Sequence, residues 1–255
     1  MYSHICLKCN KTFSSKKKEQ KYCSKSCANS VSTTNRKIED RSIFKEGLNE
    51  VNAYILGLIY SDGCISYDRH TKRFRITIAM NDKVLMEKIS TLMTPTKKLY
   101  TYKHPNGREF TYSVVSTNPD DIKYLFELGL SERKSLSISY PNIPSEFDKS
   151  FIRGYFDGDG SVYKSTTNTY YKGVKKSYNY LCIKFTTGSK VFAKQLRECL
   201  RKHGILSNVV QDSRGKETYY VSIQSKKNVG EFFKYIYKDS TFYMERKYNK
   251  FIEMI

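Results

Sequence analysis

The chain has 255 residues, with 45 Lys and Arg against 25 Asp and Glu, which gives a formal net charge of +20. This length allows one large domain or two smaller ones, and so strong a positive charge indicates a polyanionic partner such as a nucleic acid. The sequence contains no apolar run of the 18 or more residues that a membrane helix needs, and its polar N-terminus does not look like a signal peptide. We therefore expect a soluble, cytoplasmic protein with no membrane partner.

The first 30 residues carry four cysteines in two close pairs and little apolar material. So short a segment does not bury enough surface to fold unaided, whereas a tetrahedral metal ion would supply the missing free energy. Disulfides are the alternative, which an intracellular location disfavours, and His4 is a weaker candidate ligand. We predict a structural zinc module in residues 1–30, with the ligands Cys6, Cys9, Cys23 and Cys27.

A polar, basic stretch follows the module and is predicted to be a linker over residues 31–47. Together, module and linker would add an extra clamp on a nucleic acid. The other cysteines, Cys64, Cys182 and Cys199, are scattered, so we expect them to pack in the core or to remain free. The histidines further along, including His203, are isolated in the sequence.

Two stretches, residues 55–63 and 151–160, share one pattern: an apolar helix with two small residues four positions apart, ending at an acid followed by glycine. Small residues at this spacing lie on one helix face and let the backbone of a partner helix approach closely. We therefore predict that the two stretches pack against each other. This packing would bring Asp62 and Asp159 together at the ends of their helices.

An acid at the C-terminal end of a helix is disfavoured by the helix dipole, and two such acids repel each other, which raises the pKa of one of them. A divalent cation removes both penalties, and paired carboxylates that hold Mg²⁺ are typical of phosphodiester chemistry. The alternative is that both Asp-Gly pairs are ordinary helix-ending turns. Recurrence of the whole pattern in two places favours the metal site.

The remainder of the chain is predicted to be an internal duplication, because Asp62 and Asp159 are 97 positions apart and similar elements follow each of them. Each copy reads as helix, hairpin, helix, hairpin, helix, which is a mixed α+β unit used twice. We assign the copies to residues 48–146 and 147–255. The hairpins are expected at 64–79, 98–115, 163–180 and 208–224, of which 163–180 is a long, basic, polar finger.

The motif stretches ILGLIYSDG and IRGYFDGDG, each opening such a unit, resemble those of the LAGLIDADG homing endonucleases over residues 48–255. The first departs from the family at Tyr60, where the family often has Asp. The resemblance implies tandem αββαββα units that form a pseudo-twofold saddle over double-stranded DNA. It also implies a monomeric, site-specific endonuclease of a mobile element, which cuts both strands of a long asymmetric target during intron homing.

The resemblance further implies roles for single residues. The two motif acids would bind Mg²⁺ or Mn²⁺ at the scissile phosphates, helped by the main-chain carbonyls just before them, and a basic residue after the third helix of each unit would lie near each phosphate. The implied metal ligands are Asp62, Asp159, Ser61 and Gly158. The implied catalytic residues are Asp62, Asp159, Lys134 and Lys247. The four-cysteine segment is similar to small zinc modules attached to intron-associated endonucleases.

Base contacts are expected from basic side chains on the hairpins. Strand alternation supports this, since it places Arg73, Arg75 and Thr77 together on one polar face. The candidates in the first copy are Arg69, Lys72, Arg73, Arg75, Lys103 and Arg108. The candidates in the second copy are Lys164, Lys172, Lys175, Lys176, Lys184, Arg214 and Lys216.

Other functions would use the same basic surface. An RNA maturase would bind its host intron RNA and help it to splice, but it would gain nothing from two acids at the seam. A DNA-binding regulator on this fold would be expected to lose the acids or the accompanying lysines, and simple ribosomal RNA binding does not explain the duplication. The chain ends carry no splicing-junction residues, so we do not expect an intein.

Overall fold

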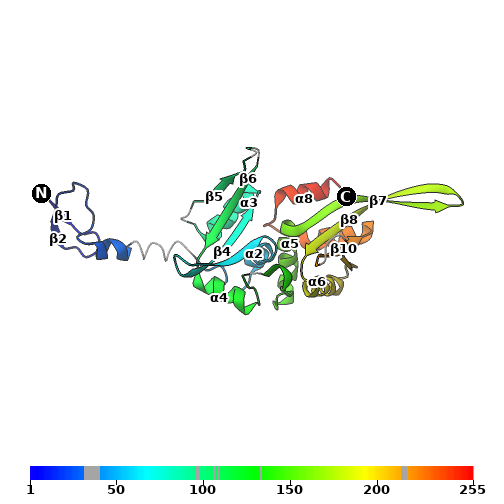
Figure 1. Ribbon diagram of the computed structural model, residues 1–255, viewed down its shortest axis with the longest axis horizontal. Coiled ribbons are helices and arrows are strands. Elements are labelled where there is room, and N and C mark those ends of the chain that lie inside the picture. Colours follow the sequence, from blue (N-terminus) through cyan, green and yellow to red (C-terminus); the bar gives the residue numbers. More distant parts are fainter. Residues whose placement is uncertain are drawn as a thin grey trace.

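Two units of the same topology follow each other along the chain, each built on an antiparallel four-stranded sheet (Figure 1). The computed structural model describes residues 1–31, 41–95, 98–105, 107, 109–132, 134–213 and 217–254. The first unit comprises α2 (Glu50–Ser61), β3 (Gly63–Asp68), β4 (Arg73–Met80), α3 (Lys83–Met93), β5 (Tyr100–Lys103), β6 (Phe110–Ser116) and α4 (Pro119–Glu127). The second comprises α5 (Asp148–Asp159), β7 (Gly160–Tyr171), β8 (Val174–Thr187), α6 (Lys190–Lys202), β9 (Asn208–Gln211), β10 (Tyr219–Gln224) and α7 (Lys226–Tyr237).

The strand orders are β3-β4-β6-β5 and β7-β8-β10-β9, so every strand of one sheet has a counterpart in the other. The predicted α+β architecture of tandem αββαββα units is thereby confirmed. The helix α8 (Glu245–Ile252) and the short 3₁₀ helices η1 (Lys134–Leu136) and η2 (Ser145–Phe147) add to this pattern. At the N-terminus, β1 (Tyr2–Ile5) and β2 (Thr12–Ser15) form a separate hairpin, which lies apart from the two units in Figure 1.

The two motif helices, α2 and α5, lie side by side between the two sheets (Figure 1). This position explains why α2 is apolar on every face, since all its residues from Asn52 to Tyr60 are buried. Asn49 begins α2 with a capping box, in which its side chain accepts from the backbone of Val51 and Asn52. The Asn52 amide in turn donates to the carbonyls of Ile43 and Gly47, so the segment before the helix is held against it.

The first hairpins of the two units differ in length, as predicted. The strands β7 and β8 have 12 and 14 residues, against 6 and 8 in β3 and β4. Both residues of the β7–β8 turn, Lys172 and Gly173, have positive φ angles, which suits the right-handed twist of a two-residue hairpin turn. The β7–β8 hairpin consequently projects well beyond the rest of its unit (Figure 1).

Strand β4 shows how each sheet separates an apolar face from a polar one. Ile76, Ile78 and Met80 are buried beneath the helices, whereas Arg73 and Arg75 are exposed on the other face. Alternation along the strand accounts for this division. The basic, open face predicted for β4 is therefore present.

Candidate active site at the seam of the motif helices

The motif helices cross through their glycines. A Cβ atom on Gly57 would overlap the carbonyl oxygen of Phe151 and lie 2.7 Å from the nitrogen of Tyr155. A Cβ atom on Gly154 would likewise overlap the carbonyl oxygen of Tyr54. The two backbones approach more closely than any side chain at these positions would permit, and the predicted packing of the two stretches is confirmed.

The same crossing brings the two acids together. Asp62 follows the last residue of α2, and Asp159 is the last residue of α5. Gly158 lies directly against the first unit, since a Cβ atom there would overlap both the Ser61 hydroxyl and the Asp62 carboxylate. Each acid is therefore supplied by one unit, and both lie at one end of the shared seam, where both side chains are open to solvent.

The surroundings of the acids raise the pKa of both carboxyls. Partial burial raises the pKa of Asp62, although a hydrogen bond from Ser61 and the nearby lysines oppose the effect. Burial, followed by repulsion from Asp62, raises the pKa of Asp159 to about 6. The expected repulsion between the two acids is present in the raised pKa of Asp159. A divalent cation that binds there would have to displace a proton that is held more tightly than by an isolated carboxylate.

Two lysines approach the same place from opposite units. Lys134 of η1 is 7% exposed, and its ammonium donates to the carbonyls of Tyr60 (2.5 Å) and Ser61 (3.2 Å). Cations are favoured at the C-terminal end of a helix, where carbonyls lack partners within the helix. Burial nevertheless lowers the pKa of Lys134 to about 8, while Asp159 and Asp62 act in the opposite direction.

Lys247 of α8 is the counterpart in the second unit. Its ammonium lies within hydrogen-bond distance of four main-chain carbonyls, those of Phe156 (2.7 Å), Asp157 (2.8 Å), Gly158 (3.1 Å) and Gly160 (2.7 Å), and shares its three N–H donors among them. Burial lowers the pKa of Lys247 to about 8, against the attraction of neighbouring acids. The two lysines thus cap the two motif helices, and the carbonyls of Ser61 and Gly158 both accept hydrogen bonds from them.

Asp157, two residues before the second acid, organises the second unit. Its buried carboxylate accepts from the hydroxyls of Tyr54 (2.8 Å) and Tyr237 (2.9 Å) and from the backbone nitrogen of Met244 (2.8 Å). Tyr54 belongs to α2, whereas Met244 lies three residues before Lys247. Asp157 therefore connects the helix seam to the segment that delivers the second lysine.

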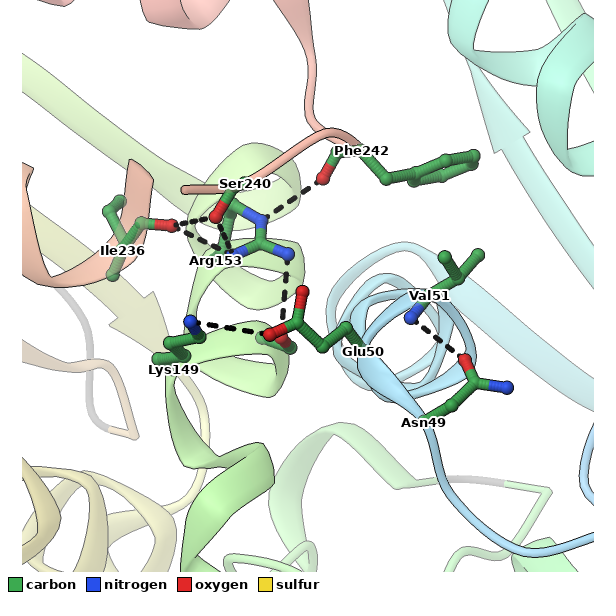
Figure 2. Close-up of polar contacts among 9 residues, drawn as sticks. Asn49, Glu50, Val51, Lys149, Arg153, Ile236, Ser240 and Phe242 are labelled. Atoms are coloured by element: carbon green, nitrogen blue, oxygen red, sulfur yellow. Dashed lines mark hydrogen bonds and ion pairs between the residues drawn. The ribbon is translucent and has the colours of Figure 1, made fainter. Parts of the chain in front are cut away.

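Arg153 holds the same segment from the next turn of α5. Its buried guanidinium donates to the carbonyls of Phe242 (3.0 Å) and Ile236 (2.8 Å) and to the hydroxyl of Ser240 (2.6 Å). Figure 2 shows this guanidinium directed at the loop after α7, with an ion pair between Lys149 and Glu50 beside it. These contacts fix residues 236–244 relative to α5 before α8 begins.

The first unit uses a different residue at the position of Asp157. Tyr60 is buried, its hydroxyl donates to the carbonyl of Leu128 (3.2 Å), and its ring meets Phe151 edge-on at 5.1 Å. Leu128 caps α4, the helix that corresponds to α7. Both residues therefore tie a motif helix to the end of the corresponding helix in their own unit, so Tyr60 has a structural role although it departs from the family pattern.

The basic candidates for DNA contact are distributed along the hairpins. Those exposed on the first sheet are Arg69, Lys72, Arg73, Arg75 and Lys103, and those exposed on the second are Lys164, Lys172, Lys175 and Lys176. Lys184 is half-buried, with its ammonium 3.9 Å from the centre of the Tyr220 ring. Arg75 is partly engaged, since it donates to the Ser66 hydroxyl at 3.0 Å. Arg108, Arg214 and Lys216 lie outside the described residues.

The four N-terminal cysteines converge. Their sulfur atoms all lie within 4.8 Å of one another, and the Cys9–Cys23 and Cys23–Cys27 pairs are each 3.6 Å apart. Zn–S bonds of about 2.3 Å in a tetrahedron separate the sulfurs by about 3.8 Å, so the four thiols fit such an ion. His4 stays outside, with its ring nitrogen 3.1 Å from the carbonyl oxygen of Lys17.

The other cysteines follow the expectation, whereas one histidine does not. Cys64 is exposed, and Cys182 is buried in β8. Cys199 is buried in the core, as expected, but His203 is not isolated, because it and Cys199 both meet Asp148 at the other end of α5. Sequence reasoning missed this meeting because the three residues come together only when α5 packs beside α6.

A family model for the LAGLIDADG-like domain matches residues 49–128 and 146–237. A probable translation initiation factor IF-2 of Methanocaldococcus jannaschii is 29% identical over 227 residues, which is 82% of this chain and 17% of that protein. The replication factor C small subunit of the same organism is 24% identical over 212 residues, or 81% of this chain and 10% of that protein. The chain therefore spans less than a fifth of the length of either relative.

Solved structures share the fold. The homing endonuclease I-LtrWI bound to its target DNA matches with a TM-score of 0.53 and 18% identity, covering 80% of this chain and 89% of that one. The meganuclease I-AabMI bound to uncleaved DNA matches with a TM-score of 0.52 and 17% identity, covering 81% and 90%. I-SmaMI bound to an uncleaved DNA target with calcium matches with a TM-score of 0.52 and 15% identity, covering 81% and 89%.

In the described part of the chain, no helix has the length and apolarity required to cross a bilayer. The family match covers well over half of the sequence and falls on both units, each of which begins with one of the two motif helices. The paired Asp-Gly helix ends, the duplicated sheets and this match agree. The chain belongs to the LAGLIDADG-like domain family and has the fold of its DNA endonucleases.

Proposed function

We propose that this chain is a site-specific homing endonuclease that hydrolyses both strands of a long, asymmetric DNA target with the help of Mg²⁺ or Mn²⁺. One observation carries the proposal: two acids, one from each unit, meet at the end of a glycine-lined seam with a buried lysine on either side. Neither folding nor nucleic-acid binding requires such a cluster, since two neighbouring carboxyls repel each other and bind phosphates poorly.

The acids would hold the metal ions. Asp62 and Asp159 present carboxylate oxygens, which are the ligands that Mg²⁺ prefers, and they remain open to solvent and therefore to a phosphate backbone. The carbonyls of Ser61 and Gly158 are further candidate ligands. When bound, the metal ions would lower the pKa of a coordinated water and stabilise charge on the leaving oxygen.

The lysines would first have to release those carbonyls. Lys134 bonds the Ser61 carbonyl, and Lys247 bonds the Gly158 carbonyl, so each lysine competes with metal for one backbone oxygen. Once released, an ammonium group at this place could stabilise the charge that develops on a phosphate. Lys134 and Lys247 are therefore proposed as catalytic residues that occupy these two carbonyls in the absence of DNA.

The sheets would provide the DNA surface. The open face of β4 and the projecting β7–β8 hairpin carry exposed basic side chains, and such side chains contact phosphates and base edges. Because the β7–β8 hairpin is longer than β3–β4, the second half of the target would be contacted over a greater length. This difference supports an asymmetric target that a single chain recognises as a monomer.

The N-terminal cysteines would bind a structural Zn²⁺ ion. Its removal is expected to unfold residues 1–31 and weaken DNA binding, because a segment of this size has no other source of folding energy and carries positive charge. The catalytic seam does not include these residues. Cleavage of a saturating target by zinc-depleted protein is therefore expected to persist.

The proposal is tested with a DNA substrate that joins the two sequences flanking the chain's own gene and lacks the gene and the insertion that carries it. The measurement is cleavage of this substrate. We expect linear double-strand product with Mg²⁺ for the natural chain, and none for Asp62→Asn combined with Asp159→Asn. Asp120→Asn, which alters an exposed acid at the start of α4, is the control and should cut normally. An RNA maturase would instead leave the DNA intact and promote splicing in both forms of the protein, which would overturn the proposal.

A further inference from the structure

A second group of metal-binding side chains lies at the end of α5 opposite to the catalytic acids. Asp148 is the first residue of α5, Cys199 lies in the last turn of α6, and His203 caps α6. Their ligand atoms all lie within 4.8 Å of one another. At a rise of about 1.5 Å per residue, this end of α5 is about 16 Å from Asp159, so the group is separate from the catalytic seam.

The geometry of the group is close to that of a tetrahedral site. The imidazole nitrogen Nε2 of His203 is 3.4 Å from the Oδ2 oxygen of Asp148. Ligands held at about 2.1 Å from a tetrahedral ion are themselves about 3.4 Å apart. The Cys199 thiol is turned into the same space, where it contacts the Tyr140 hydroxyl at 3.3 Å. That hydroxyl donates to the Oδ1 oxygen of Asp148 at 2.7 Å.

An unpaired hydroxyl faces the same group. The hydroxyl of Tyr235, in α7, is buried and has no hydrogen-bond partner among the described residues. The Tyr235 ring stacks on the His203 ring at 4.6 Å. Cys199 and Asp148 are neighbours of this hydroxyl. Buried hydroxyls almost always have a partner, so this one indicates that a polar species belongs in the space.

We propose that Asp148, Cys199 and His203 bind one Zn²⁺ ion, with the fourth position taken by water or by the Tyr235 oxygen. A ligand set of one sulfur, one nitrogen and one oxygen suits Zn²⁺, whereas Mg²⁺ prefers oxygen ligands alone. The site is largely enclosed, since Asp148 and Cys199 are each 7% exposed, and His203 forms its open edge.

The ion would fasten three helices of the second unit to one another and, through Tyr140, to the connector that precedes that unit. Asp148 starts α5, Cys199 and His203 end α6, and Tyr235 belongs to α7, while Tyr140 lies in the connector between the two units. The site thus joins the connector to the helices that cover the second sheet. Its role would be structural, and it is independent of the four N-terminal cysteines and of the proposed DNA cleavage.

The test is the zinc content of the full-length chain, loaded with Zn²⁺ in excess Mg²⁺ and then dialysed. We expect Cys199→Ser and His203→Gln each to hold one Zn²⁺ ion fewer per chain than the natural sequence. Cys182→Ser is the matched control, since it also removes a buried thiol from the second unit but lies outside the group. It should keep the full complement.

Thermal unfolding provides a second readout. Adding Zn²⁺ to chelator-treated protein should raise the unfolding temperature of the natural chain and of Cys182→Ser by the same amount, and that of His203→Gln by less. His203 is at the surface, so its variant should fold even if Cys199→Ser does not. Equal zinc content in all four proteins, or an equal loss in Cys182→Ser, would overturn the proposal.

Discussion

The two units place an acid and a lysine at the same seam, but they hold them by different means. In the first unit the motif helix is apolar, and one hydroxyl, that of Tyr60, ties it to the end of α4. In the second unit, buried Asp157 and Arg153 bind the segment from Ile236 to Met244. A duplicated fold can therefore keep the geometry of its reactive groups while the supporting contacts diverge.

The lysines reflect the same difference. Lys134 follows α4 within a few residues and reaches two carbonyls, whereas Lys247 sits on an additional helix, α8, and reaches four. A longer connection has more freedom to lose on folding, so it needs more contacts to hold its end in place. We infer that the polar network of the second unit exists to position α8.

Apart from the two acids, the lysines give the largest expected effects on activity. Lys247→Met should slow cleavage of one strand by about 100-fold, the loss that follows removal of one stabilising donor, and leave nicked DNA to accumulate. Lys134→Met should slow the other strand by a similar factor. Gels of end-labelled target resolve the two strands. Equal slowing of both strands in each variant would show that the lysines do not serve separate halves of the site.

The glycine crossing should give a large effect on stability. Gly154→Ala places a methyl group against the backbone of Tyr54, which cannot move without separating the helices, so we expect a loss of about 3 kcal/mol or more in the free energy of unfolding. Gly230→Ala is the control, since Gly230 lies within α7 and nothing lies within 4 Å of a Cβ atom there. It should stabilise the protein by about 0.5–1 kcal/mol. Urea unfolding measures both.

The supporting contacts of the two units should differ in strength. Asp157→Ala leaves three buried donors without their acceptor, which is expected to cost about 3 kcal/mol or more, whereas Tyr60→Phe removes one hydrogen bond and should cost about 1 kcal/mol. Urea unfolding of the two variants checks this order. Equal losses in the free energy of unfolding would contradict the structure, in which Asp157 accepts three hydrogen bonds and the Tyr60 hydroxyl donates one.

The smallest effects are shifts in titration. The pKa of Asp159 is raised to about 6, so in the metal-free protein this group contributes stability at low pH that is lost as the pH rises from about 4 to 6. Metal binding requires the carboxylate and should strengthen over the same range. Asp62→Asn removes a repulsive neighbour and should lower the pKa of Asp159, whereas Lys247→Met removes an attractive one and should raise it. Carboxyl NMR signals would follow both shifts.

The duplicated fold and the two acids could be predicted because their signals are local. Two small residues four apart and an acid before glycine are visible within ten residues, and their recurrence identified both units. Lys134 and Lys247 required the family resemblance, since nothing in their own neighbourhood distinguishes them from surface lysines. The structure adds the contacts that bury them.

The supporting contacts could not be predicted, because their partners are distant in the sequence. Asp157 meets Tyr54 across 103 positions and Met244 across 87. His203 meets Asp148 across 55. Such pairs are determined by how helices pack, not by any local pattern. The one local indication was that two acids, Asp157 and Asp159, stand close together at the end of the second motif stretch. This pattern favours a role for Asp157 as well as for Asp159.

Strand-resolved cleavage by the single motif variants tests most directly whether acids from both units form one active site. With Mg²⁺ and the joined flanks as substrate, we expect the natural chain to cut both strands. Asp62→Asn and Asp159→Asn should each lose cleavage of at least one strand by about 1000-fold, because removing a metal ligand withdraws several kcal/mol of transition-state stabilisation. Unimpaired cutting of both strands by either variant would contradict the shared site.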